Sequence, residues 1–146
     1  MFNRILVAID KSELINKILD VTMEIAHNKR THVTLIHVSN LNVAMGLPYI
    51  PEDYLEEILI EMDKDSIKYL EEAKSQLISK GISTEIIHLK GDPAHEILKY
   101  AKNNQQQLTV IGSRGLSGMK EMMLGSVSHK VSQLSSCPVL IVHLKN

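Results

Sequence analysis

Residues 108–128 have the sequence LTVIGSRGLSGMKEMMLGSVS, in which a glycine-rich segment directly follows a short, mostly apolar one. Residues 108–112 have the composition of a buried strand. Glycines after such a strand permit a positive φ and close backbone approach, so that consecutive N–H groups can converge on an anion. The sequence therefore predicts that this strand ends at a phosphate-binding loop.

The second half of this stretch, Gly125 to Ser128, carries one glycine and two serines. If it faces the first half, it adds a backbone donor and two hydroxyls for phosphate oxygens, and Arg114 or Lys120 can add positive charge. The alternative is that the glycines only make turns and that Gly125 permits tight helix packing. The position directly after a buried strand favours phosphate binding.

Outward from this segment, apolar strand patterns alternate with amphipathic helix patterns along the whole chain. Strands are expected at 5–9, 32–38, 82–89, 108–112 and 138–144. Helices are expected at 10–28, 52–80, 93–103 and 121–134. Residues 39–51 form a connection longer than is usual in a compact domain.

Three helix ends carry clear sequence signals. Asp10 with Glu13 has the spacing of a capping box for the first helix. Asp92 followed by Pro93 predicts the start of the third helix. Gly81 is expected to end the second.

Five strands separated by helices predict an α/β fold, a single doubly wound five-stranded parallel sheet with helices on both faces (Rossmann-like). In such sheets a ligand lies beyond the carboxyl ends of the strands, where the strand order reverses. The two strands expected there end at Asp10 and Gly112. The strand at 82–89 is expected at an edge, and the one at 138–144 is expected to be buried on both faces.

The composition is that of one soluble domain spanning residues 1–146, with 44% hydrophobic and 23% charged residues. A net charge of -1, a pI near 6.6 and 3% aromatic residues argue against a nucleic acid or an anionic membrane as partner. The apolar run before Asp10 is too short for a signal peptide, so a cytoplasmic location is expected.

Other chemistries have little support in the sequence. Neither a Walker A motif, nor a dinucleotide fingerprint after the first strand, nor a nucleophile elbow is present. Cys137 is the single cysteine and is expected to pack beside Pro138, and the seven histidines show no metal-ligand spacing. Asp10 can hydrogen-bond a ribose hydroxyl, assist a bound cation or cap the following helix.

Four segments together resemble the universal stress protein family. They are ILVAID with Ser12-Glu13, LIHV, the spacing Gly112-x2-Gly115-x9-Gly125-Ser126, and PVLIV. The resemblance covers essentially the whole chain, and the long glycine spacing matches the ATP-binding members. It implies an adenine nucleotide alpha hydrolase-like fold and a homodimer formed through the strand Pro138–Leu144. Lys11 departs from the pattern, since many members have glycine there.

The resemblance also implies a ligand set. Asp10 and its neighbours would contact ribose or phosphate, Val38 the adenine edge, and the glycine loop the phosphates of ATP, ADP or AMP, with Mg as a possible companion. The candidate site residues are Ala8, Ile9, Asp10, Ser12, Val38, Ile111, Gly112, Ser113, Arg114, Gly115, Leu116, Ser117, Gly118, Gly125, Ser126, Val127 and Ser128.

The function expected from these features is that of an ATP-binding regulatory protein of the stress response, without an efficient catalytic machinery. One alternative is a slow nucleotide hydrolase or nucleotidyl-transfer enzyme that uses Asp10 and a divalent cation; it needs a second convergent acid, which the sequence does not reveal. A receiver-like signalling domain is a weaker alternative. It requires an acceptor Asp directly after the strand 82–89, where Lys90 and Gly91 stand before Asp92.

Overall fold

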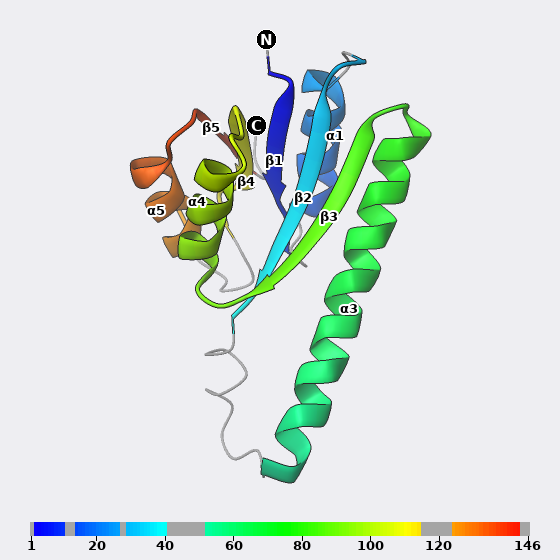
Figure 1. The fold of residues 1–146 in the computed structure, drawn as a ribbon, viewed down its shortest axis with the longest axis vertical. Helices are drawn as coiled ribbons and strands as arrows, with labels where there is room; N and C mark the ends of the chain where they lie inside the picture. The colour runs from blue at the N-terminus through cyan, green and yellow to red at the C-terminus, as the bar shows by residue number, and fades with distance from the viewer. Residues whose placement is uncertain (1, 11–13, 27–28, 41–51, 115–123, 144–146) are drawn as a thin grey trace.

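The computed structural model describes residues 2–10, 14–26, 29–40, 52–114 and 124–143 (Figure 1). Its elements, in chain order, are β1 (Arg4–Ala8), α1 (Ile15–Ile25), β2 (His32–Ser39), α3 (Glu52–Ser79), β3 (Ser83–Lys90), α4 (Pro93–Asn103), β4 (Leu108–Gly112), α5 (Ser126–Leu134) and β5 (Val139–Val142).

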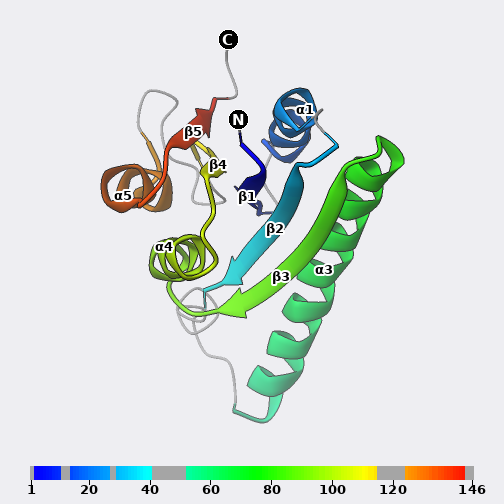
Figure 2. The same cartoon turned by 45° about the horizontal axis from the view of Figure 1, so that its top comes forward.

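The five strands form one parallel sheet in the order β3-β2-β1-β4-β5. Figure 2 shows α1 and α3 on one face of the sheet and α4 and α5 on the other. The predicted fold class is therefore confirmed. The chain runs outward from β1 in one direction to β3 and returns to the other side at β4, so the strand order reverses between β1 and β4.

The apolar run of β1 is buried because both faces of this central strand are covered. Ile5 and Val7 join the core under α1 and α3, whereas Leu6 and Ala8 join the core under α4 and α5. Ile5, Leu6 and Val7 are all completely inaccessible to solvent. This alternation explains why the sequence of β1 is continuously apolar instead of alternating with polar residues.

Two of the predicted helix ends are confirmed. The Asp92 carboxylate accepts a 2.9 Å hydrogen bond from the His95 backbone N–H, and Pro93 occupies the first turn of α4. Gly81, with a φ of +79°, ends the segment after α3 in the left-handed region that glycine tolerates.

The prediction that Asp10 caps the first helix is wrong. Helix α1 begins at Ile15, and its N-cap is Leu14, with no side-chain capping bond. The chain stays with the sheet beyond β1, because the Ile9 N–H donates to the Ile36 carbonyl at 2.9 Å. Asp10 therefore lies just beyond the end of β1 and not at the start of α1.

The predicted helix 121–134 begins later than expected: of its described residues, 124 and 125 are not helical. Leu124 and Gly125 precede α5, and Gly125 is its N-cap with φ −63° and ψ 160°. The Gly125 N–H donates to the Ser113 carbonyl at 2.7 Å, which ties this turn to the end of β4 and leaves Gly125 extended. Residues 121–123 lie outside the described residues.

The predicted edge position of β3 is confirmed, but β5 is not buried on both faces as expected. It is the other edge strand, and within it only Val142 is fully buried, whereas Leu140 is 36% exposed. Val139 and Ile141 pack partly against the core under α4 and α5. The opposite face of β5 is covered only toward Val142, which joins the core that α1 covers.

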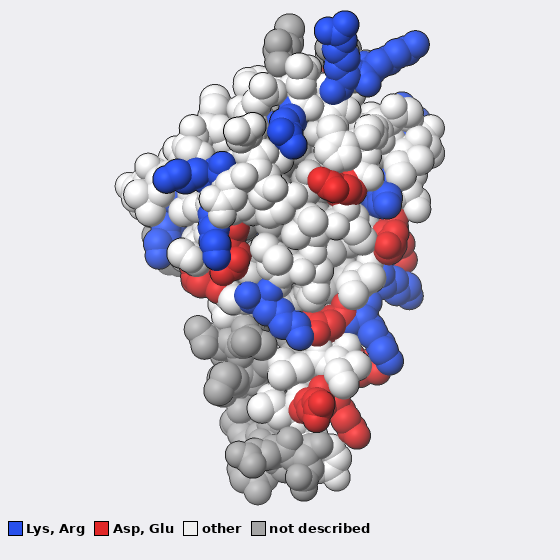
Figure 3. Space-filling view, viewed as in Figure 1, with Lys and Arg blue, Asp and Glu red and all other residues white. Residues whose placement is uncertain are grey.

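The surface carries both signs of charge. On the face in Figure 3, lysine and arginine are interspersed with aspartate and glutamate, in accord with the net charge of -1. Cys137 is half-buried, and its Sγ lies 3.4 Å from Thr109 Oγ. Among the helices of the described ranges, none has the length and apolarity needed to cross a bilayer.

Candidate functional site

A cavity of about 430 Å³ opens at the C-terminal edge of the sheet, where the strand order reverses between the neighbouring strands β1 and β4. Its walls come from the ends of β1, β2 and β4, from α3 and α4, and from the first turn of α5. This is the position that the doubly wound topology predicts for a ligand, and the volume lies within the usual range of small-molecule sites.

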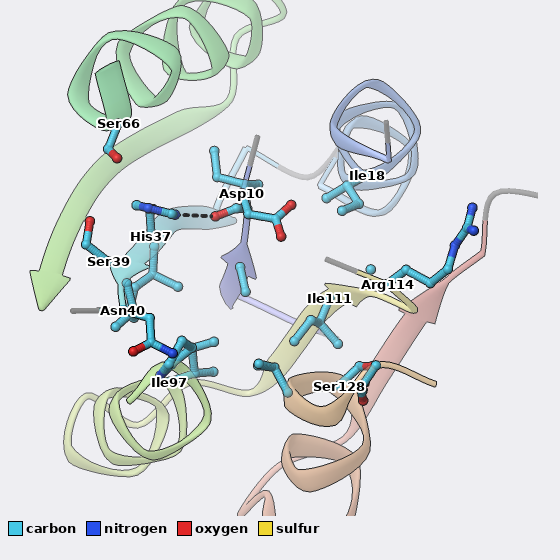
Figure 4. A pocket seen from close by; sticks show the side chains of 18 of the residues that line it. Asp10, Ile18, His37, Ser39, Asn40, Ser66, Ile97, Ile111, Arg114 and Ser128 are labelled. Carbon is cyan, nitrogen blue, oxygen red and sulfur yellow. Dashed lines mark hydrogen bonds between the residues drawn. The ribbon is translucent and has the colours of Figure 1, made fainter. Parts of the chain in front are cut away.

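Most of the candidate residues that the structure describes meet at this cavity (Figure 4). Those that line it are Ala8, Ile9, Asp10, Val38, Ile111, Gly112, Arg114, Gly125, Ser126, Val127 and Ser128. Ser113 does not line it. The predictions for Ser12, Gly115, Leu116, Ser117 and Gly118, and for Lys120, fall outside the described residues.

Ser113 instead joins the two halves of the predicted phosphate clamp. Its N–H donates to the Val142 carbonyl at 2.8 Å, and its own carbonyl accepts from the Gly125 N–H. The buried Ser128 hydroxyl also lies within hydrogen-bond distance of the Ser113 and Gly125 carbonyls, at 3.1 and 3.0 Å. The Ser128 hydroxyl hydrogen is therefore used inside the protein, and Ser128 organises the turn instead of supplying a side-chain donor to the cavity.

The first turn of α5 provides the donors at this end of the cavity. Ser126, Val127 and Ser128 all line it, and the first N–H groups of a helix have no partner within the helix. The helix dipole adds partial positive charge at the same point, which makes the turn suitable for an anion. Arg114 also lines the cavity, with its guanidinium directed away from the cavity centre in Figure 4.

Glycine is needed at Gly112 for close approach. A Cβ there would lie 3.0 Å from Leu14 Cδ1 and 3.2 Å from Ile18 Cδ1, so α1 could not pack as closely on β4. Neither Gly112 nor Gly125 has a positive φ, in contrast to Gly81 and Gly91. A positive φ is thus not the reason for glycine at these two positions. Close approach requires glycine at Gly112, whereas a Cβ at Gly125 would meet the Ser113 carbonyl oxygen only at 3.4 Å.

The opposite end of the cavity is apolar and lies between the sheet and α4. Ile36, Val38 and Ile111 face it from three positions on the strands, and Ile97 faces it from α4. All four side chains are buried, with Val38 at 8% exposure. Such a slot suits a flat, largely apolar ring that offers a few polar atoms at its edge.

A third wall comes from α3 and the end of β2, and the sequence analysis did not find it. It consists of His37, Ser39, Asn40, Met62, Asp65, Ser66 and Tyr69. A signal for it exists in the sequence. His37 interrupts the apolar run from Leu35 to Val38. Ser66 and Tyr69 share helical spacing with the buried Leu70, Ala73 and Leu77. The remaining lining residues that were not predicted are Ile18, Ile36, Pro93 and Ile97.

The His37 ring is fixed by three contacts. Its Nδ1 lies 3.0 Å from the Ile9 carbonyl, which can only accept, so Nδ1 carries the hydrogen (Figure 4). Tyr69 meets the ring edge-on at 5.3 Å, and His88 stacks parallel to it at 5.6 Å. Burial lowers the pKa of His37, and the bond to Ile9 only partly opposes this, so the ring is neutral at pH 7.

Two acidic residues line the same cavity. Asp10 follows β1, and Asp65 projects from α3. Asp65 is thus a second acid at the cavity that the sequence analysis did not identify. Burial raises the pKa of Tyr69 and nearby Asp10 adds to the rise, so the Tyr69 phenol remains protonated. Within the described ranges, no three or more His, Cys, Asp or Glu side chains are grouped so as to hold a metal ion.

Comparisons with known proteins agree with this fold. The model of the universal stress protein family matches residues 1–143. Universal stress protein YxiE of Bacillus subtilis is 49% identical over 97% of this chain and 99% of its own length. The solved structure of protein MJ0577 superposes with a TM-score of 0.90 at 29% identity, covering 100% of this chain and 99% of that one; MJ0577 comes from Methanocaldococcus jannaschii.

Two more distant structures share the fold and hold a nucleotide. A family protein from Arabidopsis thaliana with AMP bound has a TM-score of 0.69 at 20% identity, covering 95% of this chain and 90% of that one. A universal stress protein from Archaeoglobus fulgidus in complex with dAMP has a TM-score of 0.67 at 23% identity, covering 96% and 97%. On the whole-length family match and the near-half identity to YxiE, this chain belongs to the universal stress protein family.

Proposed function

We propose that this protein is an adenine-nucleotide-binding regulatory protein of the cytoplasm with a role in the stress response. The observation that carries the proposal is the composition of one cavity at the strand-order switch. One end combines the first turn of α5 with Arg114, and the other is an apolar slot. An anion at one end and a flat ring at the other is the pattern of a nucleotide.

In the proposed complex the phosphates lie against the N–H groups of α5, where the helix dipole favours negative charge. The adenine lies between Val38 and Ile97, with its polar edge toward the backbone at the end of β2. Asp10 lies between these two ends and accepts from the ribose hydroxyls. AMP and dAMP in family structures from other organisms support an adenine nucleotide as the ligand class.

ATP, with or without Mg, is the finer proposal for the ligand, and it rests on the glycine spacing of residues 112–126. A regulatory role is favoured over turnover, since the described donors of the cavity are suited to binding and neutralising a phosphate. The alternative, slow hydrolysis or nucleotidyl transfer with Asp10 and a divalent cation, gains Asp65 as a second acid at the cavity. Steady release of phosphate by purified protein would favour that alternative.

The binding experiment is a calorimetric titration of ATP, ADP, AMP and adenosine, with and without magnesium. We expect saturable binding of the nucleotides and weaker binding of adenosine. A Gly125→Val variant should lose affinity, since its Cβ would already lie 3.4 Å from the Ser113 carbonyl and its γ carbons would crowd the turn. Gly125→Ala is the matched control and should bind more nearly as wild type does. Absence of nucleotide binding to folded wild type would refute the proposal.

We also propose a homodimer formed through β5. Among the described strands β5 is an edge strand, and with Leu140 exposed it offers its outer backbone edge and an apolar side chain to a second copy. Leu140→Glu should therefore shift the protein toward the monomer in sedimentation experiments. Ile78→Glu is the control, because Ile78 is similarly exposed but lies on α3. A wild-type protein that remains monomeric at high concentration would refute this assembly.

A further inference from the structure

A pair of histidines links the cavity to the outer edge of the sheet. The register of β2 on β3 places His37 directly opposite His88, and their rings stack with an interplanar angle of 3°. His37 lines the cavity, whereas His88 lies behind it. Any change of charge on His88 therefore acts on the cavity wall through one neighbouring ring.

His88 also contacts a residue of the cavity wall, through the Ser39 hydroxyl. Its Nε2 lies 2.8 Å from Ser39 Oγ, and Ser39 lines the cavity. The same Nε2 lies 3.8 Å from Asp63 Oδ1 on α3, while Lys90 Nζ holds the other carboxylate oxygen at 2.8 Å. His88 thus lies between a hydroxyl of the cavity wall and a carboxylate that can stabilise its cation.

Burial lowers the pKa of His88, Asp63 opposes this and Lys90 adds to the lowering, so the ring is neutral at pH 7 and takes up a proton only as the pH falls. Asp63 and Tyr69 face the pair from α3, Asp10 faces it from the end of β1, and Lys90 lies beside Asp63 on β3. The more deeply buried His37 already donates Nδ1–H to the Ile9 carbonyl. A charge on His88 opposes a second charge on His37, because the ring centroids are 5.6 Å apart.

Protonation of His88 changes what Ser39 can offer to a ligand. The neutral ring accepts the Ser39 hydroxyl hydrogen at Nε2 in its Nδ1–H tautomer, whereas Nε2 donates to Ser39 in the other tautomer. Protonated His88 carries hydrogen on both ring nitrogens, so Nε2 can only donate to Ser39 Oγ. The Ser39 hydroxyl hydrogen is then released toward another acceptor, and a positive charge stands directly behind the wall.

We propose that His88 is a proton-dependent positioning residue, through which mild acidity strengthens the binding of an anionic nucleotide in the cavity. The inference rests on the proposed function and adds to it a regulation by pH. It needs no movement of the backbone, because the stack, the Ser39 bond and the Asp63 carboxylate are already in place. By linkage, the bound nucleotide should in turn favour the protonated form of His88.

The test measures AMP affinity at pH 7.5 and pH 5.0 for wild type, His88→Gln and the control His32→Gln. His32 is the matched histidine at the other end of the same strand pair, where it contacts Glu85 at 3.3 Å and Ser83 at 2.8 Å. Comparing the variants at each pH removes the titration of the AMP phosphate itself. We expect the affinity of wild type relative to His88→Gln to rise about three- to tenfold at pH 5.0, and His32→Gln to follow wild type.

A second variant keeps His88 and moves its titration. In Asp63→Asn the carboxylate that favours the His88 cation is gone, so the gain in affinity should require a lower pH than in wild type. NMR titration of the imidazole resonances in the nucleotide-free protein should show the same displacement, with His88 taking up a proton at higher pH than His37. A purely structural role of His88 would leave the pH midpoint of the gain in affinity unchanged, even though the NMR midpoint of His88 moves.

The possible results separate this inference from the proposed function. Binding of AMP with the same pH dependence in wild type and His88→Gln would overturn the inference and leave nucleotide binding intact. If the pH midpoint of the gain in AMP affinity is the same in Asp63→Asn as in wild type, the inference is also overturned. If wild type binds no adenine nucleotide at either pH, the proposed function and this inference fail together.

Discussion

A negative charge at the start of α5 should separate phosphate recognition from adenosine recognition. Ser126 is the first residue of α5; it lines the cavity and is exposed to solvent. Ser126→Glu places a carboxylate where the nucleotide phosphates are proposed to bind. A glutamate in the first turn is itself favourable to a helix, so the fold should be retained.

The magnitude follows from Coulomb's law. At a separation of about 6 Å and an effective dielectric constant between about 40 and 80, two unit charges repel by about 0.7–1.4 kcal/mol. For the roughly double negative charge of AMP this amounts to about 1.4–2.8 kcal/mol, or about a 10- to 100-fold loss of affinity. Adenosine carries no phosphate, so its affinity should change by less than about twofold.

The assay is isothermal titration of AMP and adenosine into wild type, Ser126→Glu and Gln133→Glu. Gln133 is exposed near the other end of α5 and does not line the cavity, so it receives the same charge change without the proposed contact. Unfolding curves of all three proteins check the fold. If folded Ser126→Glu binds AMP as tightly as wild type, or if adenosine loses as much affinity as AMP, the phosphates do not bind at α5.

Three further predictions concern stability. Gly112→Ala should lower the free energy of unfolding by about 1–3 kcal/mol in urea titrations, since its Cβ would crowd Leu14, and a smaller residue at position 14 should recover part of the loss. Asp92→Ala should cost about 1 kcal/mol by removing the cap of α4; an unchanged urea midpoint would argue against that cap. Burial lowers the pKa of His37 in the folded state, so the unfolded chain binds more protons below about pH 6.5. The contribution of neutral His37 to the free energy of unfolding is therefore fully present above that pH and decreases as the pH falls toward the lowered pKa. His37→Gln should flatten this decrease in thermal melts between pH 7.5 and pH 5, and an equally steep decrease in the variant would contradict the cause.

The fold could be predicted because its signals are local. The apolar run of β1 and the Asp92-Pro93 start of α4 each depend on a few adjacent residues, and the alternating order of strands and helices then leaves one architecture. The start of α1 could not be predicted in this way. Asp10 has the spacing of a cap, but the hydrogen bond from Ile9 to Ile36 of β2, a residue distant in sequence, keeps the chain extended.

The candidate site likewise contains residues that local sequence signals predict and residues that only tertiary packing brings together. Residues of the glycine segment could be predicted because the end of a buried strand marks Gly112 and the long glycine spacing marks Ser126, and both line the cavity. The α3 wall was missed, since only the register of β2 on β3 and the packing of α3 bring Tyr69 beside His37. Ser113 shows the opposite error: proximity in sequence predicted a ligand contact, whereas its backbone joins β5 to the turn before α5.

The location of the cavity follows from the way in which the two cores meet. Alternate residues of β1 belong to opposite cores, and this alternation ends where the strand ends, at Ala8 and Ile9. Beyond that point the helices of the two faces no longer share a strand to cover, so α3 and α5 are held apart and the cavity opens between them. Asp10 is the second residue past β1 and lines this cavity. The reversal of strand order between β1 and β4 thus creates the cavity and also positions Asp10 beside it. The direction of the parallel strands brings the N-terminus of α5, and not its C-terminus, to the same edge of the sheet.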